Sequence, residues 1–146
     1  MKKLGRKNRR KDWPTRPLPR VTEVKSPARM DIWLARLPSH KGNSVQGGTR
    51  PVLVVSNNAA NVYSPVVTIL PMTTKMKHLM QPTHVVLPDA GGRDSLVLAE
   101  QITSIPKRWL IQHLGRCEDS GEQKQIEDAM RMQIGLEGNG NEPNHL

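Results

Sequence analysis

The stretch QGGTRPVLVVSNN, residues 46–58, places an arginine between a pair of glycines and a short apolar run. The run PVLVVSN is rich in valine and too short for a helix, so it predicts a buried strand. Gly47 and Gly48 allow backbone conformations, or close approaches, that a Cβ atom would block. Arg50 is therefore expected at the start of a rigid strand, directly after a tight loop. An arginine fixed there suits a phosphate, which its planar guanidinium binds through two hydrogen bonds.

Arg50 also has a structural interpretation. Its charge could equally be neutralised inside the protein by a nearby acid, such as Asp94 or Glu100. The residues of this stretch alone do not separate a phosphate site from an internal ion pair, so both interpretations stay open at this point.

Short apolar segments lie on both sides of this strand along the chain. Those expected to form strands are DIWLARL (31–37), VVTILPMT (66–73), THVVLP (83–88) and SLVLAEQITSI (95–105). Between them, NNAANVYSP (57–65) and DAGGRD (89–94) contain turn-forming residues, and KMKHLMQ (75–81) is a polar linker. Strands of this length and spacing favour a small barrel over alternating strand–helix units.

The C-terminal third has helical signals in place of short strands. PKRWLIQHL (106–114) opens with Pro106, which suits the first turn of a short helix. Ser120 and Gln123 fit a capping box at the start of a longer helix. Five positions after this box recur at helical spacing and form a stripe expected to pack on the barrel or on a partner subunit: Ile126, Ala129, Met130, Gln133 and Ile134.

Charge is unevenly distributed along the 146 residues, whose formal net charge is +9. Residues 1–29 contain 11 Lys and Arg side chains against two acidic ones, whereas the remainder is formally neutral. Because 1–29 also has several prolines and few apolar residues, it is expected to be a disordered extension. Such an extension either contacts nucleic acid or serves solubility, and both explanations stay open. We expect a folded domain at 30–137 and a flexible tail at 138–146.

Several kinds of site have no signal in the sequence. Cys117 is the only cysteine, so we expect no intramolecular disulfide and no cysteine-based zinc site, and the residue is most simply a small buried one. His84 could act as a base, but a strand histidine is more often satisfied by its neighbours, and His78 has no evident partner. No apolar run is long enough to span a membrane, and no secretory signal is evident. We expect a cytoplasmic protein without a metal, a cofactor or a membrane partner.

Five segments, taken together, resemble the MazF/PemK toxins: DIWLA, QGGTRPVLVVSNN, SPVVTILPMTT, PTHVVL and LAEQITSI occur in the order and spacing of that family. The resemblance runs from about Asp31 to the C-terminal helix. The family comprises mRNA endoribonucleases of type II toxin–antitoxin systems. The resemblance therefore implies a mainly β (α+β) fold, a small SH3-like barrel of the CcdB/MazF type with a C-terminal helix. It also implies a homodimer whose interface forms an RNA groove, with single-stranded mRNA and a cognate antitoxin protein as partners.

The resemblance also assigns roles to individual residues. The family's catalytic arginine and threonine fall on Arg50 and Thr73. A further set is expected to bind RNA or support the site: Gln46, Gly47, Gly48, Ser64 and Thr74. Val45 stands where some members carry an acidic residue, so that carboxylate is not available to this chain.

The chemistry that the resemblance implies needs neither a metal nor a protein nucleophile. The ribose 2′-OH attacks the adjacent phosphate and expels the 5′-oxygen, which leaves a 2′,3′-cyclic phosphate and a 5′-OH. Arg50 would stabilise the charge that develops on the phosphate, and Thr73 would donate a hydrogen bond to it. Two other functions stay open: a CcdB-like toxin that inhibits DNA gyrase without chemistry, and a plain RNA-binding module. The Arg-Pro loop followed by a threonine favours the nuclease.

Overall fold

The computed structural model describes residues 26–39, 42, 45–90 and 92–136. The elements of these residues follow the chain in the order β1 (Asp31–Leu37), β2 (Gly48–Val54), α2 (Asn58–Tyr63), β3 (Val66–Thr73), β4 (His84–Ala90), β5 (Arg93–Leu98), β6 (Thr103–Pro106), β7 (Leu110–Arg116) and α3 (Ser120–Gln133). Two short 3₁₀ turns, η3 (Ala99–Gln101) and η4 (Lys107–Trp109), precede β6 and β7.

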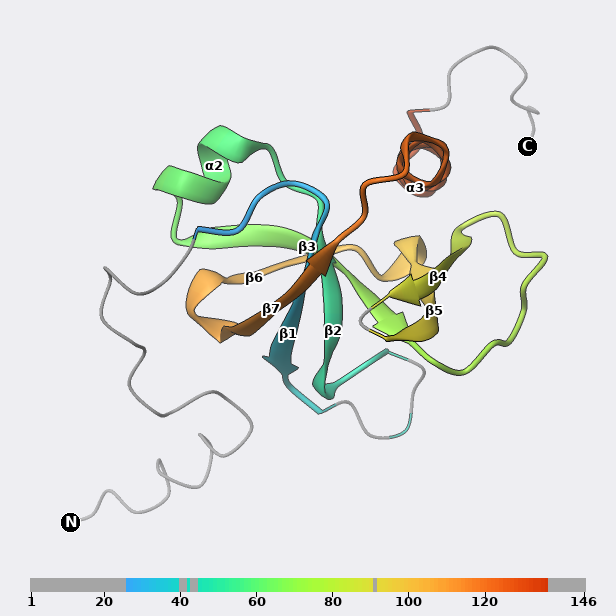
Figure 1. Cartoon of the computed structure of the whole chain (residues 1–146), viewed down its shortest axis with the longest axis horizontal. Helices are drawn as coiled ribbons and strands as arrows, with labels where there is room; N and C mark the ends of the chain where they lie inside the picture. Colours follow the sequence, from blue (N-terminus) through green and yellow to red (C-terminus); the bar gives the residue numbers. More distant parts are fainter. Residues whose placement is uncertain (1–25, 40–41, 43–44, 91, 137–146) are drawn as a thin grey trace.

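The described strands form one antiparallel sheet in the order β4-β5-β3-β2-β1-β7, and β6 pairs with β3 beside this path. Most of β3 pairs with β2 and β6, whereas its last two residues, Met72 and Thr73, pair with β5. Because β3 changes partners along its length, the sheet turns over at this strand and curls into a small barrel (Figure 1). The expected mainly β barrel with a C-terminal helix is confirmed.

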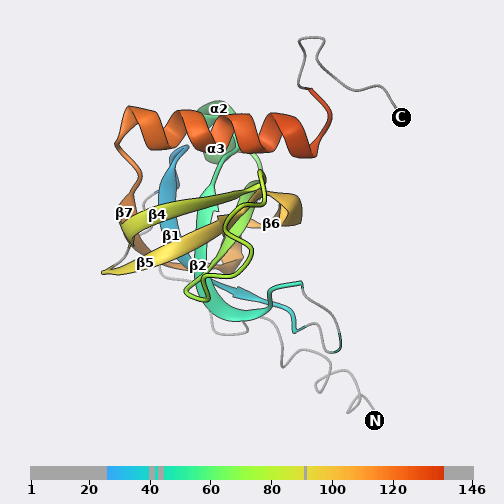
Figure 2. The ribbon, with the colours of Figure 1, turned by 90° about the vertical axis from the view of Figure 1, so that its right-hand side faces the viewer.

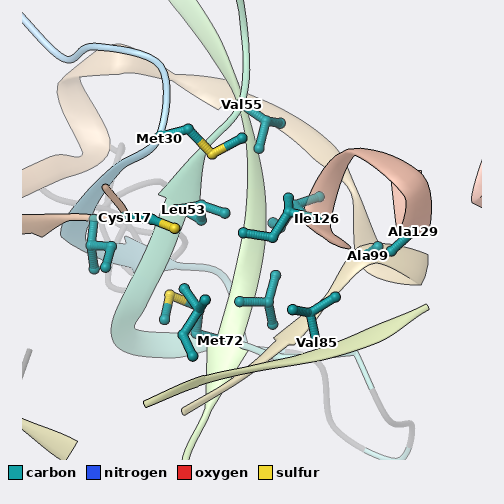
Figure 3. Close-up of a cluster of buried hydrophobic side chains, with 13 residues drawn as sticks. Met30, Leu53, Val55, Met72, Val85, Ala99, Cys117, Ile126 and Ala129 are labelled. Carbon is teal, nitrogen blue, oxygen red and sulfur yellow. The ribbon is translucent and has the colours of Figure 1, made fainter. Parts of the chain in front are cut away.

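Two clusters of buried side chains form the core. One is built from aliphatic residues, methionines and Cys117, and it lies between the strands and α3 (Figure 3). The other contains Trp33 and Trp109 together with aliphatic residues of β1, β2, β3 and β6. Cys117 is buried as expected, and its pKa is raised to about 11 by burial and by the carboxylates of Glu122 and Asp119. It is therefore an uncharged, apolar member of the core at neutral pH.

Helix α3 lies across the barrel (Figure 2), and its N-cap lies one residue before the predicted one. Asp119, not Ser120, is the N-cap, and its carboxylate accepts a hydrogen bond of 2.9 Å from the Glu122 amide. The apolar stripe is buried only over its first half, at Ile126 and Ala129. The other members of the stripe are partly or fully exposed: Met130, Gln133 and Ile134. No described helix is long and apolar enough to cross a membrane.

The predicted short helix over 106–114 is wrong. Only the turn η4 is helical there, and the chain continues as strand β7, which pairs with β1 at one edge of the sheet. Trp33 and His113 face each other across this pair, with ring centroids 5.4 Å apart. Backbone pairing with β1 thus outweighs the local helical signal of Pro106. Conversely, the expected turn over 57–65 contains α2, which Asn57 caps by accepting a 2.8 Å hydrogen bond from the Ala60 amide.

The folded domain begins a few residues before Met30. Arg29, which the charge pattern places in the extension, donates to the carbonyl of Val55 and forms an ion pair of 2.9 Å with Glu127 of α3. Ala28 exchanges two hydrogen bonds with Asp31. Ala28 and Arg29 therefore contact the folded domain, although both lie in the expected extension. The rest of the expected extension and the expected tail at 138–146 lie outside the described residues.

Candidate active site

The β1–β2 loop requires its two glycines for different reasons. A Cβ atom at Gly47 would lie 2.3 Å from the carbonyl oxygen of Pro38, so only glycine lets the two arms of the loop approach. Gly48 has a φ of +81°, a left-handed conformation that other residues adopt only with strain. The sequence predicted that the glycines permit a close approach or an unusual backbone conformation. The structure confirms the close approach at Gly47 and the unusual conformation at Gly48. Together they bring the chain sharply into β2, two residues before Arg50.

The Arg50 side chain is held by backbone carbonyl groups. Its Nε donates to the Gly47 oxygen at 2.9 Å, and its Nη1 donates to the Met72 oxygen at 3.2 Å. Both acceptors are neutral, so they fix the direction of the guanidinium without cancelling its charge. The side chain is half-buried, and this burial lowers the pKa of Arg50 from its usual value. An arginine remains a cation at neutral pH even so.

No described carboxylate pairs with Arg50. Asp94, one of the two acids considered as partners, accepts a 2.9 Å hydrogen bond from the Asp89 amide. Glu100, the other, binds His84 at 2.8 Å and Thr83 at 3.0 Å. The interpretation of Arg50 as an internal ion pair with either acid is therefore wrong. The positive charge remains available to an anion from outside.

Thr73 is connected to Arg50 through its neighbour in β3. The β2–β3 pairing ends at Val52 and Pro71, and Thr73 itself pairs with Leu96 of β5. The carbonyl that binds Arg50 belongs to Met72, the residue directly before Thr73. The Thr73 hydroxyl oxygen accepts a 3.2 Å hydrogen bond from the Lys75 amide, which leaves its own O–H free to donate. A fixed cation and a hydroxyl donor are thus anchored at two successive residues of β3, Met72 and Thr73, an arrangement that suits phosphate binding.

The predicted supporting residues fall into two groups. Gln46, Gly47 and Gly48 lie in the β1–β2 loop next to Arg50, and Thr74 is exposed directly after Thr73 at the start of the β3–β4 loop. That loop swings out beside the β4–β5 hairpin (Figure 1). The structure therefore brings together all the predicted site residues except Ser64.

Ser64 lies at the other end of β3. It ends α2, and its hydroxyl oxygen accepts a 3.1 Å hydrogen bond from the Val66 amide. The eight residues of β3 separate it from Thr74, a distance of roughly 25 Å for an extended strand. Within one chain, Ser64 supports the turn into β3 and does not contact the Arg50 site.

Some residues at the site had no role assigned from their pattern. Gln101 accepts a 2.8 Å hydrogen bond from the Gln46 amide and so holds the β1–β2 loop. Its segment LAEQ was expected to be a strand but contains the turn η3. From this turn Gln101 binds the β1–β2 loop, and Glu100 binds Thr83 at the end of the β3–β4 loop. His84 is satisfied by its neighbours, as expected. Among the described residues, no group of three or more His, Cys, Asp or Glu side chains could hold a metal ion.

Comparison with known proteins places this geometry in a family. Residues 28–134 match the family described as PemK-like, MazF-like toxin of type II toxin-antitoxin system. The chain belongs to this toxin family. A curated relative, Endoribonuclease MazF of Staphylococcus saprophyticus, is 34% identical over 111 residues, which are 74% of this chain and 91% of the relative.

Solved structures of similar proteins have the same fold as this toxin-family chain. Crystalline MazF from Deinococcus radiodurans is 26% identical, with a TM-score of 0.64 over 77% of this chain and 99% of that protein. An endoribonuclease from a mycobacterial species, solved in complex with its cognate antitoxin, is 26% identical, with a TM-score of 0.59 over 77% of this chain and 97% of that one.

Proposed function

We propose that this chain is the toxin of a type II toxin–antitoxin system and that it cleaves single-stranded mRNA without a metal ion. Its family and its 34% identity to an endoribonuclease make it an endoribonuclease rather than a gyrase inhibitor or a plain RNA-binding module. The observation that carries the chemical proposal is the guanidinium of Arg50, which is fixed in place by two neutral carbonyls, one of them on Met72, the residue before Thr73.

The cleavage step uses a nucleophile from the substrate. The ribose 2′-OH loses its proton and attacks the neighbouring phosphorus, the bond to the 5′-oxygen breaks, and that oxygen takes up a proton as it leaves. The products are a 2′,3′-cyclic phosphate and a 5′-OH. The protein has to orient the phosphate and stabilise the negative charge that develops on it.

Arg50 and Thr73 fit these two tasks. A guanidinium has five N–H groups, and the two described hydrogen bonds of Arg50 leave others free for phosphate oxygens. Its fixed position means that little side-chain freedom is lost when the phosphate binds. Thr73 donates its hydroxyl proton to a further phosphate oxygen. We assign Arg50 to charge stabilisation and not to proton transfer, because a guanidinium holds its proton too firmly to act as a base.

The partners follow from the same family membership. We propose that the chain acts as a homodimer in the cytoplasm, where mRNA is found, and that a cognate antitoxin protein neutralises it. The mycobacterial endoribonuclease solved with its antitoxin supports this pairing. Val45 is apolar and 43% exposed in the β1–β2 loop, so this position supplies no carboxylate to the reaction.

End-mapped cleavage of a defined RNA tests the chemistry. In excess EDTA we expect continued cleavage with 2′,3′-cyclic phosphate and 5′-OH ends. An otherwise identical substrate with 2′-deoxyribose at the scissile position should not be cut, because it lacks the nucleophile. Thr73→Val, which removes the hydroxyl at nearly constant volume, should slow cleavage, whereas the matched variant Thr74→Val should do so less. Cleavage of the deoxy substrate, or a requirement for a metal, would refute the proposed mechanism.

A further inference from the structure

The 3₁₀ turn η3 connects the two loops that border the Arg50 site. On one side, Gln101 Oε1 accepts the Gln46 amide of the β1–β2 loop at 2.8 Å. On the other, Glu100 Oε2 lies 2.8 Å from Nε2 of His84, the first residue of β4. The Nδ1 atom of His84 lies 3.0 Å from the backbone oxygen of His78, within the β3–β4 loop. A continuous chain of contacts therefore runs from one loop to the other.

The two nitrogens of the His84 ring are directed at acceptors on two different segments. A carbonyl oxygen only accepts, so the contact between Nδ1 and the His78 oxygen is one in which the ring donates. The other nitrogen, Nε2, binds Glu100. The side chain of His84 is 6% exposed, so the ring is largely shielded from water.

Glu100 is itself held by a second hydrogen bond. Thr83 donates its hydroxyl to Oε1 of Glu100 at 3.0 Å, and the Thr83 oxygen in turn accepts from Gln81 Nε2 at 3.1 Å. The hydroxyl proton of Thr83 is thus directed at Glu100. The described titratable groups that face the His84 ring are Glu100, from η3, and the His78 ring of the β3–β4 loop, whose centroid is 6.5 Å away.

We propose that His84 is a positioning residue: bound to Glu100 through one ring nitrogen and to the His78 carbonyl through the other, it ties the β3–β4 loop to η3 and thereby fixes the loop that follows Thr73. The positioning role rests on the proposed nuclease function, whereas the hydrogen bonds of His84 do not depend on it. Without the ring contacts the β3–β4 loop loses this link, and its order should fall.

Glu100→Gln and Glu100→Ala form a matched pair. A glutamine amide can donate to Nε2 while its oxygen still accepts from Thr83, and Nδ1–H still binds His78, so Glu100→Gln should keep the loop in place. Glu100→Ala removes the contact with Nε2, and His84→Gln should lose the link to His78.

The test combines amide exchange with kinetics on the full chain, at one fixed pH. Amide exchange of residues 75–81 should speed up at least tenfold in His84→Gln and in Glu100→Ala, and kcat should fall in parallel with little change in KM. Glu100→Gln should stay close to the wild type in both measurements.

Two results would overturn the proposal: wild-type exchange of residues 75–81 in His84→Gln, or a Glu100→Gln variant that behaves like Glu100→Ala. The exchange data do not depend on RNA cleavage. If the protein does not cleave RNA but these data behave as expected, the proposed function fails and the positioning contact stands. If cleavage occurs but exchange is unchanged in His84→Gln, the positioning contact fails and the proposed function stands.

Discussion

An arginine is anchored near each end of β2, and the two environments differ in one respect. Arg29 donates to the carbonyl of Val55, directly after β2, and its guanidinium also pairs with Glu127 at 2.9 Å. Arg50, near the start of the strand, donates to the carbonyls of Gly47 and Met72, and no described carboxylate pairs with it. Both side chains are oriented by backbone oxygen atoms, but only the charge of Arg29 is neutralised within the protein.

This difference separates a cation that serves the fold from one that serves a ligand. The ion pair of Arg29 links the start of the domain to α3, so it contributes to stability, modestly because both side chains are about one-third exposed. Arg50 is partly desolvated without a compensating anion, which is unfavourable in the free protein. A bound phosphate would provide that anion. Burial without a counter-charge is therefore the physical signature of the site.

Replacing each arginine by alanine should give the largest contrast. Arg50→Ala should slow RNA cleavage by about 10²–10³-fold, the typical effect of removing a preorganised charge-stabilising donor. Arg29→Ala should leave the cleavage rate close to that of the wild type and lower the melting temperature by a few degrees. Single-turnover rates and thermal melts of both variants measure this. If folded Arg50→Ala protein cleaves RNA at the wild-type rate, the functional distinction between the two arginines is refuted.

Displacing the carbonyl that holds Arg50 should have an intermediate effect. In Gly47→Ala the new Cβ would meet the Pro38 oxygen at 2.3 Å, so the loop must move and carry the Gly47 carbonyl with it. Since small misplacements of a catalytic group slow reactions strongly, we expect roughly a tenfold to hundredfold loss of cleavage rate. Gly115→Ala is the control, because a Cβ there meets no atom within 4 Å. Equal rates for the two variants would show that the carbonyl of Gly47 is not needed.

Deleting residues 1–25 should have the smallest effect on cleavage. This deletion removes ten of the Lys and Arg side chains but keeps Arg29 and its ion pair. If the deleted cations neutralise RNA phosphates, the shortened protein should bind RNA more weakly at low salt. Its salt dependence should also be flatter, by about 0.7 in log–log slope for each phosphate that the deleted cations neutralise. The cleaved sequence should not change, since contacts to phosphates are blind to the bases.

Binding of full-length and shortened Arg50→Ala protein to RNA over a salt series measures this effect. Identical slopes for the two proteins would mean that residues 1–25 have no part in RNA binding.

The sequence predicted those parts of the fold that depend on local pattern. The strands at 31–37 and 66–73 match the apolar segments from which they were expected, and the hairpin turn at DAGGRD is confirmed by the pairing of Ala90 with Arg93. The predicted helix over 106–114 was wrong because this segment forms strand β7 by pairing with β1, which is distant in the sequence. The local sequence does not indicate that pairing. Asn57 is a residue type that favours the N-cap position, but the turn-forming residues around it led to the prediction of a turn and not of helix α2.

The site could be predicted only as far as side chains reveal it. Arg50, Thr73 and the glycine pair were found from the loop pattern and the family resemblance. The groups that orient the Arg50 side chain could not be predicted in this way, because they are the backbone carbonyls of Gly47 and Met72, and any residue supplies a backbone carbonyl. Ser64 was grouped with the site only by the family resemblance, and within one chain β3 separates it from Thr73. The distinction between Arg29 and Arg50 likewise depends on Glu127, nearly a hundred residues further along.

The central claim is that the uncompensated charge of Arg50 binds the scissile phosphate, and a double-substitution cycle tests it most directly. A non-cleavable RNA with 2′-deoxyribose at the scissile position is compared with the same RNA carrying a neutral methylphosphonate there, using wild-type, Arg29→Ala and Arg50→Ala protein. We predict that neutralising this phosphate weakens binding to wild type and Arg29→Ala by about 10- to 100-fold, as expected for a charged hydrogen bond of about 1.5–3 kcal/mol. Binding to Arg50→Ala should be nearly unchanged. An equal loss in all three proteins would contradict the account.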